Sequence, residues 1–241
     1  MKKFFLIGSL CLGICCTFTN CGGKDDDDNS GGSPLQVNAT VEEGSSYDID
    51  EVRALIAIDE EYDEETGNYI WVGKEIAKGS YTGGKFSLNL PATVEDKYLE
   101  SIEEYEEYPA SISVSDRKAK GTVLAIVGYK SGKQIGDFYN EKYLETETSH
   151  SYYDVEYIYV DRNLTITGTE TDEDGDTYKY SVNMKKGWNL VYYVRTSDED
   201  SYTRETTTKA QSGLKWFFYG QESYMVSSSA KPMRKSPKLF K

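Results

Sequence analysis

His150 is the only histidine in this chain of 241 residues, and it limits the chemistry that the chain could perform. It lies between Ser149 and Ser151 in a polar stretch, and nothing nearby places a carboxylate to orient it, as a serine hydrolase triad requires. All four cysteines fall within the first 21 residues, so the sequence does not predict a zinc site of cysteine and histidine ligands. We therefore interpret His150 as an exposed loop residue rather than a catalytic one.

Residues 170–176 carry acids at alternate positions and give a second candidate site. The spacing resembles the start of a calcium loop of the EF-hand kind, with Gly175 at the sixth position. The twelfth position, where such a loop needs a bidentate glutamate, is Ser181, and the flanking residues have strand character. We therefore predict a hairpin tip with solvated acids, and no required metal or cofactor. Weak calcium binding is the alternative, with Asp172, Asp174 and Asp176 as the ligands.

Carboxylates are abundant, with 41 aspartates and glutamates, so a pair of acids for glycoside hydrolysis has to be considered. Such a pair must flank a cleft at a set separation, and sequence spacing does not show this. The acids gather in polar segments such as residues 59–65, where a solvated role is normal. We therefore predict that the protein is not an enzyme.

Three tryptophans, Trp71, Trp188 and Trp216, alternate in phase with Val, Leu and Phe residues. Exposed aromatic rings on a β protein could form a platform for sugar rings, which have a flat apolar face. Because the alternation is that of residues on an inward strand face, we predict that these three are mostly buried. The sequence does not identify which other aromatic residues would contact a ligand.

The N-terminus carries a targeting signal. Lys2 and Lys3 precede an apolar run over residues 4–16, which is the layout of a secretory signal peptide. The run is too short to span a membrane, since that needs about 20 apolar residues. Cys21 stands where a signal peptidase would act, and Lys24 and residues 25–28, all aspartate, follow it.

This segment resembles the lipobox of bacterial lipoproteins, in which the cysteine carries a diacylglycerol and an acylated amino group. The family favours Leu, Val or Ile three residues before the cysteine and Gly, Ala or Ser just before it, where this chain has Phe18 and Asn20. The acidic run resembles the Bacteroidetes-type signal that exports lipoproteins to the cell exterior. The resemblance implies lipid attachment at Cys21 and an export signal, which consists of Lys24, Asp25, Asp26, Asp27 and Asp28.

Composition excludes one class of partner. Removal of residues 1–20 leaves 25 basic residues against 41 acidic ones, a net charge of −16. Nucleic acid is therefore not an expected partner, because its phosphates need a basic surface. The mature chain has no cysteine after Cys21, so its domain must be stabilised by a hydrophobic core without disulfides.

Apolar and polar residues alternate along most of the chain, which predicts strands. The clearest examples are residues 86–90, a hairpin around Asp174–Gly175, and the apolar run Val123–Val127, which we expect to be one central strand. A loop rich in Glu and Tyr is expected between Gly132 and Tyr153. One short helix is predicted at about residues 94–105, with Thr93 as its cap and Pro109 after its end.

These patterns predict an all-β domain, either an antiparallel β-sandwich or an open barrel. The expected segments are a signal peptide (1–20), a lipidated cysteine with a flexible acidic linker (21–34), a β-sandwich-like domain (35–222) and a basic tail (223–241). A boundary near residues 115–121 could divide the domain, but each half would then have a thin core, so we expect one domain. The segments 84–91 and 185–189 resemble ones in surface lipoproteins of unknown function, which implies no activity.

Together these features predict a lipid-anchored outer-membrane protein that faces the cell exterior. Its membrane partner is reached through the lipid on Cys21. We expect a non-enzymatic binding module for glycan or protein. The alternative is a structural accessory of a surface assembly, with an envelope protein as its partner.

Overall fold

The computed structural model describes residues 33–63, 68–102, 108–198 and 201–220. The signal peptide, Cys21, Lys24, the aspartates at 25–28 and the basic tail at 223–241 lie outside these ranges. The described part is mostly β, with 67% of its residues in strands and essentially no helix, which confirms the predicted all-β fold. Its strands are β1 (Leu35–Thr40), β2 (Glu51–Asp63), β3 (Asn68–Ser80), β4 (Lys85–Leu90), β5 (Glu100–Ser101), β6 (Ile112–Val114), β7 (Lys120–Val123), β8 (Ala125–Lys130), β9 (Lys133–Glu145), β10 (Ser149–Val160), β11 (Leu164–Thr171), β12 (Thr177–Met184), β13 (Gly187–Asp198), β14 (Tyr202–Thr207) and β15 (Lys215–Gly220).

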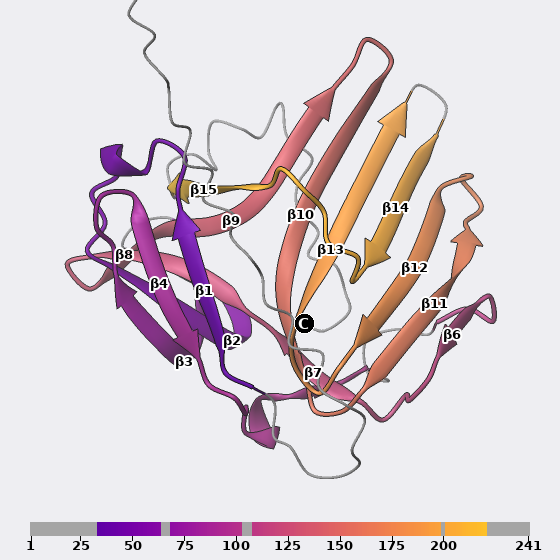
Figure 1. Ribbon diagram of the computed structural model, residues 1–241, viewed down its shortest axis with the longest axis horizontal. Coiled ribbons are helices and arrows are strands. Elements are labelled where there is room, and N and C mark those ends of the chain that lie inside the picture. Colours follow the sequence, from indigo (N-terminus) through magenta and orange to yellow (C-terminus); the bar gives the residue numbers. More distant parts are fainter. Residues whose placement is uncertain (1–32, 64–67, 103–107, 199–200, 221–241) are drawn as a thin grey trace, which may run out of the picture. The chain divides into compact units, whose positions relative to one another are not determined.

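The strands form one large sheet and one two-stranded sheet. The large sheet runs in the order β3-β2-β8-β9-β10-β13-β14-β12-β11-β6, and β1 pairs with β4 in the small one (Figure 1). β9 and β10 form a hairpin that pairs only over residues 141–145 and 150–154. Beyond this region β9 continues between β8 and β15, whereas β10 continues between β7 and β13. The large sheet therefore divides into two halves.

The first core lies where the β1–β4 sheet packs on the half that contains β2, β8, β9 and β15. In β4 every second side chain points inward, as predicted: Phe86, Leu88 and Leu90 are all buried. The large sheet contributes Trp216 of β15 and Phe138 of β9 to this core. Burial of each such side chain contributes about 1.5–3 kcal/mol. This half is sandwich-like, and its sheets do not close into a barrel.

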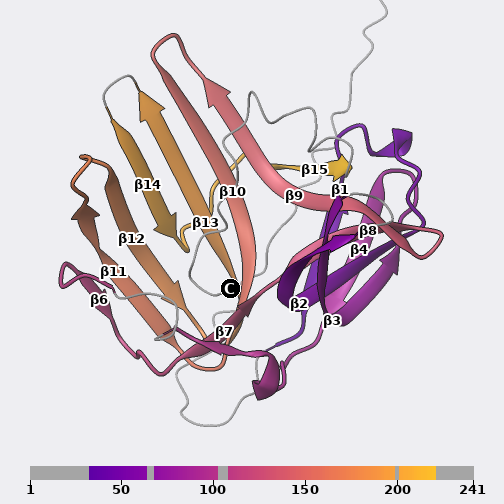
Figure 2. The ribbon, with the colours of Figure 1, turned by 180° about the vertical axis from the view of Figure 1, so that it is seen from behind.

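The second core lies on one face of the other half of the sheet. It contains alternate residues of β10 to β13, including Ile158, Ile166, Met184 and Val191, all at most 1% exposed. Ile102, Ile112 and Ala119, from the segment that precedes β7, are buried against the same cluster. This segment does not extend along the whole length of the strands, so the ends of β9, β10, β13 and β14 project beyond it (Figures 1 and 2).

The apolar run Val123–Val127 is buried, but it is not one central strand as we predicted. The chain changes neighbours at Leu124, whose backbone N–H donates to the Tyr157 carbonyl (3.0 Å). β7 pairs with β10 before this residue, and β8 pairs with β2 and β9 after it. The run is apolar because it passes between the two cores.

The helix predicted at 94–105 is also wrong over most of its length. Within residues 94–102 the structure has one 3-10 turn, η2 (Asp96–Tyr98), capped without a side-chain hydrogen bond, and residues 103–107 lie outside the described ranges. Glu100 and Ser101 pair with β7 instead. Backbone pairing with a sheet edge therefore competes successfully with the amphipathic pattern of this segment.

Residues 133–145 form strand β9, where the sequence predicts a loop. Glu, Lys, Asp and Asn residues favour loops, and β9 has several of them. The strand forms because it has hydrogen-bonding neighbours on both edges, β15 on one and β8 and β10 on the other.

Candidate functional site

Six neighbouring strands place six side chains in one row across the open half of the large sheet. The register pairs Tyr143 with Tyr152, Tyr152 with Arg195, and Arg195 with Arg204. It then pairs Arg204 with Tyr178, and Tyr178 with Glu170. Directly paired residues project from the same face of a sheet, so this row continues across β9, β10, β13, β14, β12 and β11. With strands about 4.8 Å apart, the row extends about 24 Å.

The β9–β10 end of the row carries two nearly parallel aromatic rings, those of Tyr143 and His150. Tyr143 is 56% exposed, and its ring and that of His150 are nearly parallel, at 13°, with centroids 6.4 Å apart. The Tyr143 hydroxyl lies 3.2 Å from Nδ1 of His150, within hydrogen-bonding distance.

Buried carboxylates hold the next two members of the row. The Tyr152 hydroxyl donates to Glu141, which also accepts from the Tyr219 hydroxyl. Nη1 of Arg195 donates to Oδ1 of Asp154 at 2.6 Å, and the Asp154 side chain is only 4% exposed. These charge-assisted contacts fix the orientation of both side chains before any ligand arrives.

The ring of Tyr193 contacts the guanidinium groups of both arginines. Its side chain is completely buried, and its ring centroid lies 5.8 Å from Cζ of Arg195 and 5.3 Å from Cζ of Arg204. Both guanidinium groups are thus within cation–π range of one ring, which favours two like charges in adjacent positions. Burial raises the pKa of the Tyr193 hydroxyl well above its usual range, with a further contribution from Glu156, so this ring stays neutral.

Tyr202 adds a second aromatic contact at the β12–β14 end, where its ring meets that of Tyr178 edge to face at 6.4 Å. We use the name aromatic–arginine strip for Tyr143, His150, Tyr152, Tyr178, Arg195, Tyr202 and Arg204. The opposite face of the same strands provides natural comparison residues, since side chains alternate. Leu144, 48% exposed, and Tyr153 lie on that face beside Tyr143 and Tyr152.

The acids that the sequence suggested as calcium ligands lie at the tip of the predicted β11–β12 hairpin. Oδ1 of Asp172 accepts the backbone N–H groups of Asp174 (3.0 Å) and Asp176 (2.9 Å), and Gly175 has φ of +90°. This carboxylate therefore forms the turn itself. Across the described residues, no three His, Cys, Asp or Glu side chains are grouped so that they could hold a metal.

The other residues singled out from the sequence are His150 and the three tryptophans. His150 is exposed, as expected, but it begins strand β10 rather than lying in a loop. Trp216 is buried, whereas Trp71 and Trp188 are partly buried, and each donates its indole N–H: Trp71 to Asp137 (3.0 Å) and Trp188 to the Pro91 carbonyl (2.8 Å). None of the three belongs to the strip.

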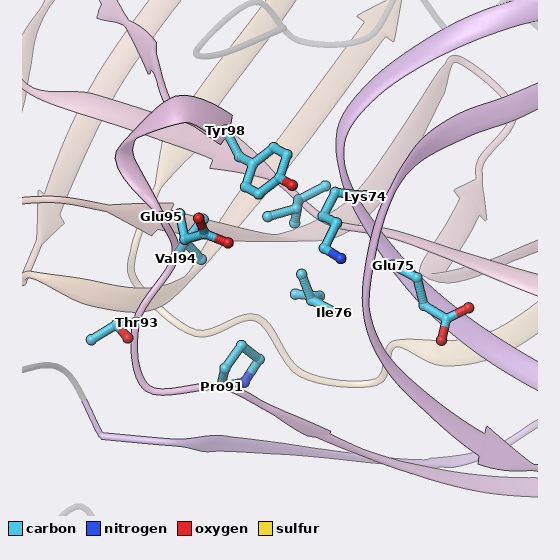
Figure 3. Close-up of a pocket in the computed structure, with 9 residues that line it drawn as sticks. Lys74, Glu75, Ile76, Pro91, Thr93, Val94, Glu95 and Tyr98 are labelled. Carbon is cyan, nitrogen blue, oxygen red and sulfur yellow. The ribbon is translucent and has the colours of Figure 1, made fainter.

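A small hollow lies between β3 and the segment after β4 (Figure 3). Its volume is about 240 Å³, and Ile56, Ile76 and Val94 are among the apolar residues that line it. In Figure 3 the amine of Lys74 points into the space, and Tyr98 stands on the far side. Ligand pockets usually have about 300–1,000 Å³, so this hollow is small for a ligand site. The Glu95 carboxylate is paired with Lys97 at 2.8 Å.

The strip was missed because its members are brought together only by strand register. Tyr143 is on the strand that we had interpreted as a loop, and Tyr152 and Tyr153 are adjacent in sequence but project from opposite faces. The useful signal was the alternation over residues 150–156, where His150, Tyr152, Asp154 and Glu156 share one face.

No family model, no curated protein and no solved structure matches this chain. In the described part, no helix is both long enough and apolar enough to cross a membrane. The function of the chain must therefore be inferred from its own residues.

Proposed function

We propose that this protein is a lipid-anchored, non-enzymatic module of the cell exterior that binds an extended glycan along the aromatic–arginine strip. The observation that carries the proposal is the row in register, with the nearly parallel rings of Tyr143 and His150 at its exposed end. Pyranose rings have a flat apolar face that packs on aromatic rings, and their hydroxyls match the phenol and guanidinium groups nearby. The lipid anchor and outward display are proposed from Cys21, Lys24 and residues 25–28.

A glycan suits the strip better than a protein does. Protein interfaces depend on a densely packed apolar centre with buried anchors. Among the described residues, the large hydrophobic side chains that are well exposed are Tyr62, Tyr143 and Leu144, and Leu144 lies on the opposite face from Tyr143. The strip itself alternates rings with polar groups, which favours a ligand that is rich in hydroxyls.

The alternative is a structural role in a surface assembly. β3 is the last strand of the large sheet order, so a partner could add a strand there. β3 carries Lys74 and Lys78, and lysines on an edge strand oppose such pairing. This makes β3 a less suitable binding surface than the strip.

The test uses the soluble chain from Pro34 to Lys241, which contains every strand of the described residues, and a panel of neutral and acidic polysaccharides. Affinity electrophoresis and titration calorimetry should find at least one that binds. Tyr143→Ala should weaken binding roughly tenfold, the equivalent of about 1.4 kcal/mol, because it removes the exposed ring. Leu144→Ala is the matched control, since Leu144 is similarly exposed on the opposite face, and it should bind as the wild type does. Equal affinities of these two variants would contradict the proposal.

A further inference from the structure

Arg204 differs from the other cation of the row in having no anionic partner within the described residues. Arg195 is neutralised by Asp154, with Nη1 2.6 Å from Oδ1. Arg204 makes no ion pair and no hydrogen bond with any described residue, and its Nε atom is buried without an acceptor. Its one defined contact is with the ring of Tyr193, 5.3 Å from Cζ.

The two arginines are energetically unfavourable in these positions unless an anion binds beside Arg204. Arg195 and Arg204 face each other directly across β13 and β14, and like charges in that position destabilise a sheet. A buried donor without an acceptor costs further free energy. Of the carboxylates on this face, Asp154 pairs with Arg195, and Glu156 acts on the Tyr193 hydroxyl. An anion bound beside Arg204 would offset both costs.

We infer that the glycan bound by the strip is acidic, and that Arg204 pairs with a carboxylate of a uronic acid unit. This inference rests on the proposed function. The planar fork of a guanidinium matches a carboxylate through two parallel N–H···O bonds, and Nε is one of the donors that such a pair uses. In the row Arg204 has Tyr178 directly on one side and Arg195, followed by Tyr152, on the other. A glycan that extends both ways from the acidic unit would therefore reach a phenol ring on each side.

The charges around the row also indicate in which direction the sugar chain runs from Arg204. Beyond Tyr178, β11 and the β11–β12 turn carry Glu170, Asp172 and Asp176, which would repel a second acidic group. On the other side of Arg204 the row leads through Arg195 and Tyr152 to the nearly parallel rings of Tyr143 and His150. The acidic unit therefore lies at β13–β14, and the chain of sugars runs from there towards β9–β10.

The experiment compares three uronic acid polymers with their own neutral forms: polygalacturonate, alginate and hyaluronate, each with its carboxylates intact or methyl-esterified. Calorimetry with the soluble chain from Pro34 to Lys241 should show that at least one acidic form binds ten or more times as tightly as its ester. Arg204→Gln should abolish this preference, so that the acidic and the esterified forms bind with similar affinity. Lys179→Gln, which removes the same charge from the opposite face of the neighbouring strand β12, should keep the preference.

The outcomes separate this inference from the proposed function. If esters bind as tightly as acids, or if Arg204→Gln retains the preference, Arg204 does not pair with a carboxylate and the inference is wrong. Binding of neutral forms that is lost in Tyr143→Ala would still support the strip as a glycan site. If no polymer of this set or of the broader panel binds, both the inference and the proposed function are wrong.

Discussion

Asp154 and Arg195 show how single residues keep a polar sheet face in one conformation. The carboxylate is 4% exposed and the guanidinium 19%, so the pair is largely removed from water. Such a pair adds little net stability compared with apolar residues, but removal of one partner leaves a buried charge uncompensated. We interpret this pair as one that positions Arg195 beside Tyr152 rather than one that stabilises the fold.

Arg195→Leu should therefore reduce the free energy of unfolding by about 3–5 kcal/mol, because Asp154 loses its cation. The double variant Asp154→Leu/Arg195→Leu should recover most of this loss, since it buries no unpaired charge. Urea melts at pH 7 measure both. Lys179→Leu, at an exposed site, serves as the control and should change stability by less than about 0.5 kcal/mol. A double variant as unstable as the single one would contradict this interpretation.

At the scale of elements, the position of β15 against β9 depends on one glycine. Gly136 has φ of +155°, and a Cβ added to it would lie 2.1 Å from the Tyr219 carbonyl oxygen. Its cross-strand partner, Gly220, has more space: a Cβ there would meet its nearest atom at 3.7 Å. The two glycines of one pair thus have different roles.

Gly136→Ala should lower the free energy of unfolding by more than about 2 kcal/mol, because β15 must move away from β9 and the first core must then open. Gly220→Ala, in the same pair, should change it by about 0.5 kcal/mol or less. Thermal or urea melts of the two variants measure the difference. If the two variants melted together, the close approach of β15 at Gly136 would not exist.

Local sequence patterns were enough to predict some strands but not others. β4 and the β11–β12 hairpin were predictable because alternation, a proline and an Asp–Gly turn all lie within a few residues of each strand. β9 was not, because its residues favour loops and its stability comes from neighbours far away in sequence. The break at Leu124 and the strip itself depend on register between distant strands, which one sequence does not show.

For the whole molecule, buried tyrosines determine how the free energy of unfolding changes at high pH. Burial raises the pKa of Tyr81 to about 12, and its hydroxyl donates to the Gly44 carbonyl at 2.9 Å. Burial also raises the pKa of Tyr157 and of Tyr193. An unfolded tyrosine titrates near pH 10, so above that pH the unfolded chain loses protons that the folded chain retains.

Stability should therefore be constant up to about pH 10 and then fall as the pH rises towards about 12, by about 1.4 kcal/mol per pH unit for each such tyrosine. Urea melts between pH 8 and pH 12 measure this fall. Tyr81→Phe should make it less steep, whereas Tyr62→Phe, at a side chain that is 56% exposed, should not. A stability that does not change across this range would show that these hydroxyls are accessible to solvent.

The proposed lipid anchor and the proposed export signal can be tested separately by mutation. Cys21→Ala should abolish labelling by a fatty-acid analogue, because no other thiol follows the apolar run. Replacement of Asp25, Asp26, Asp27 and Asp28 by Ala should leave the lipid in place, because these residues carry no acyl chain. Protease added to intact cells should remove the wild-type domain but not that of the quadruple variant. Protection of the wild type would place the domain inside the cell envelope.

The central claim is that ligand binds on one face of the open sheet, and tyrosine ring signals can report this face directly. We would label the tyrosine rings of the soluble chain with ¹³C and titrate it with an oligosaccharide of the polymer that binds most tightly in the panel. Tyr143, Tyr152 and Tyr178 should shift, while Tyr153, adjacent to Tyr152 but on the opposite face, should not. Shifts confined to Tyr153, or to Tyr98 at the hollow of Figure 3, would contradict the account.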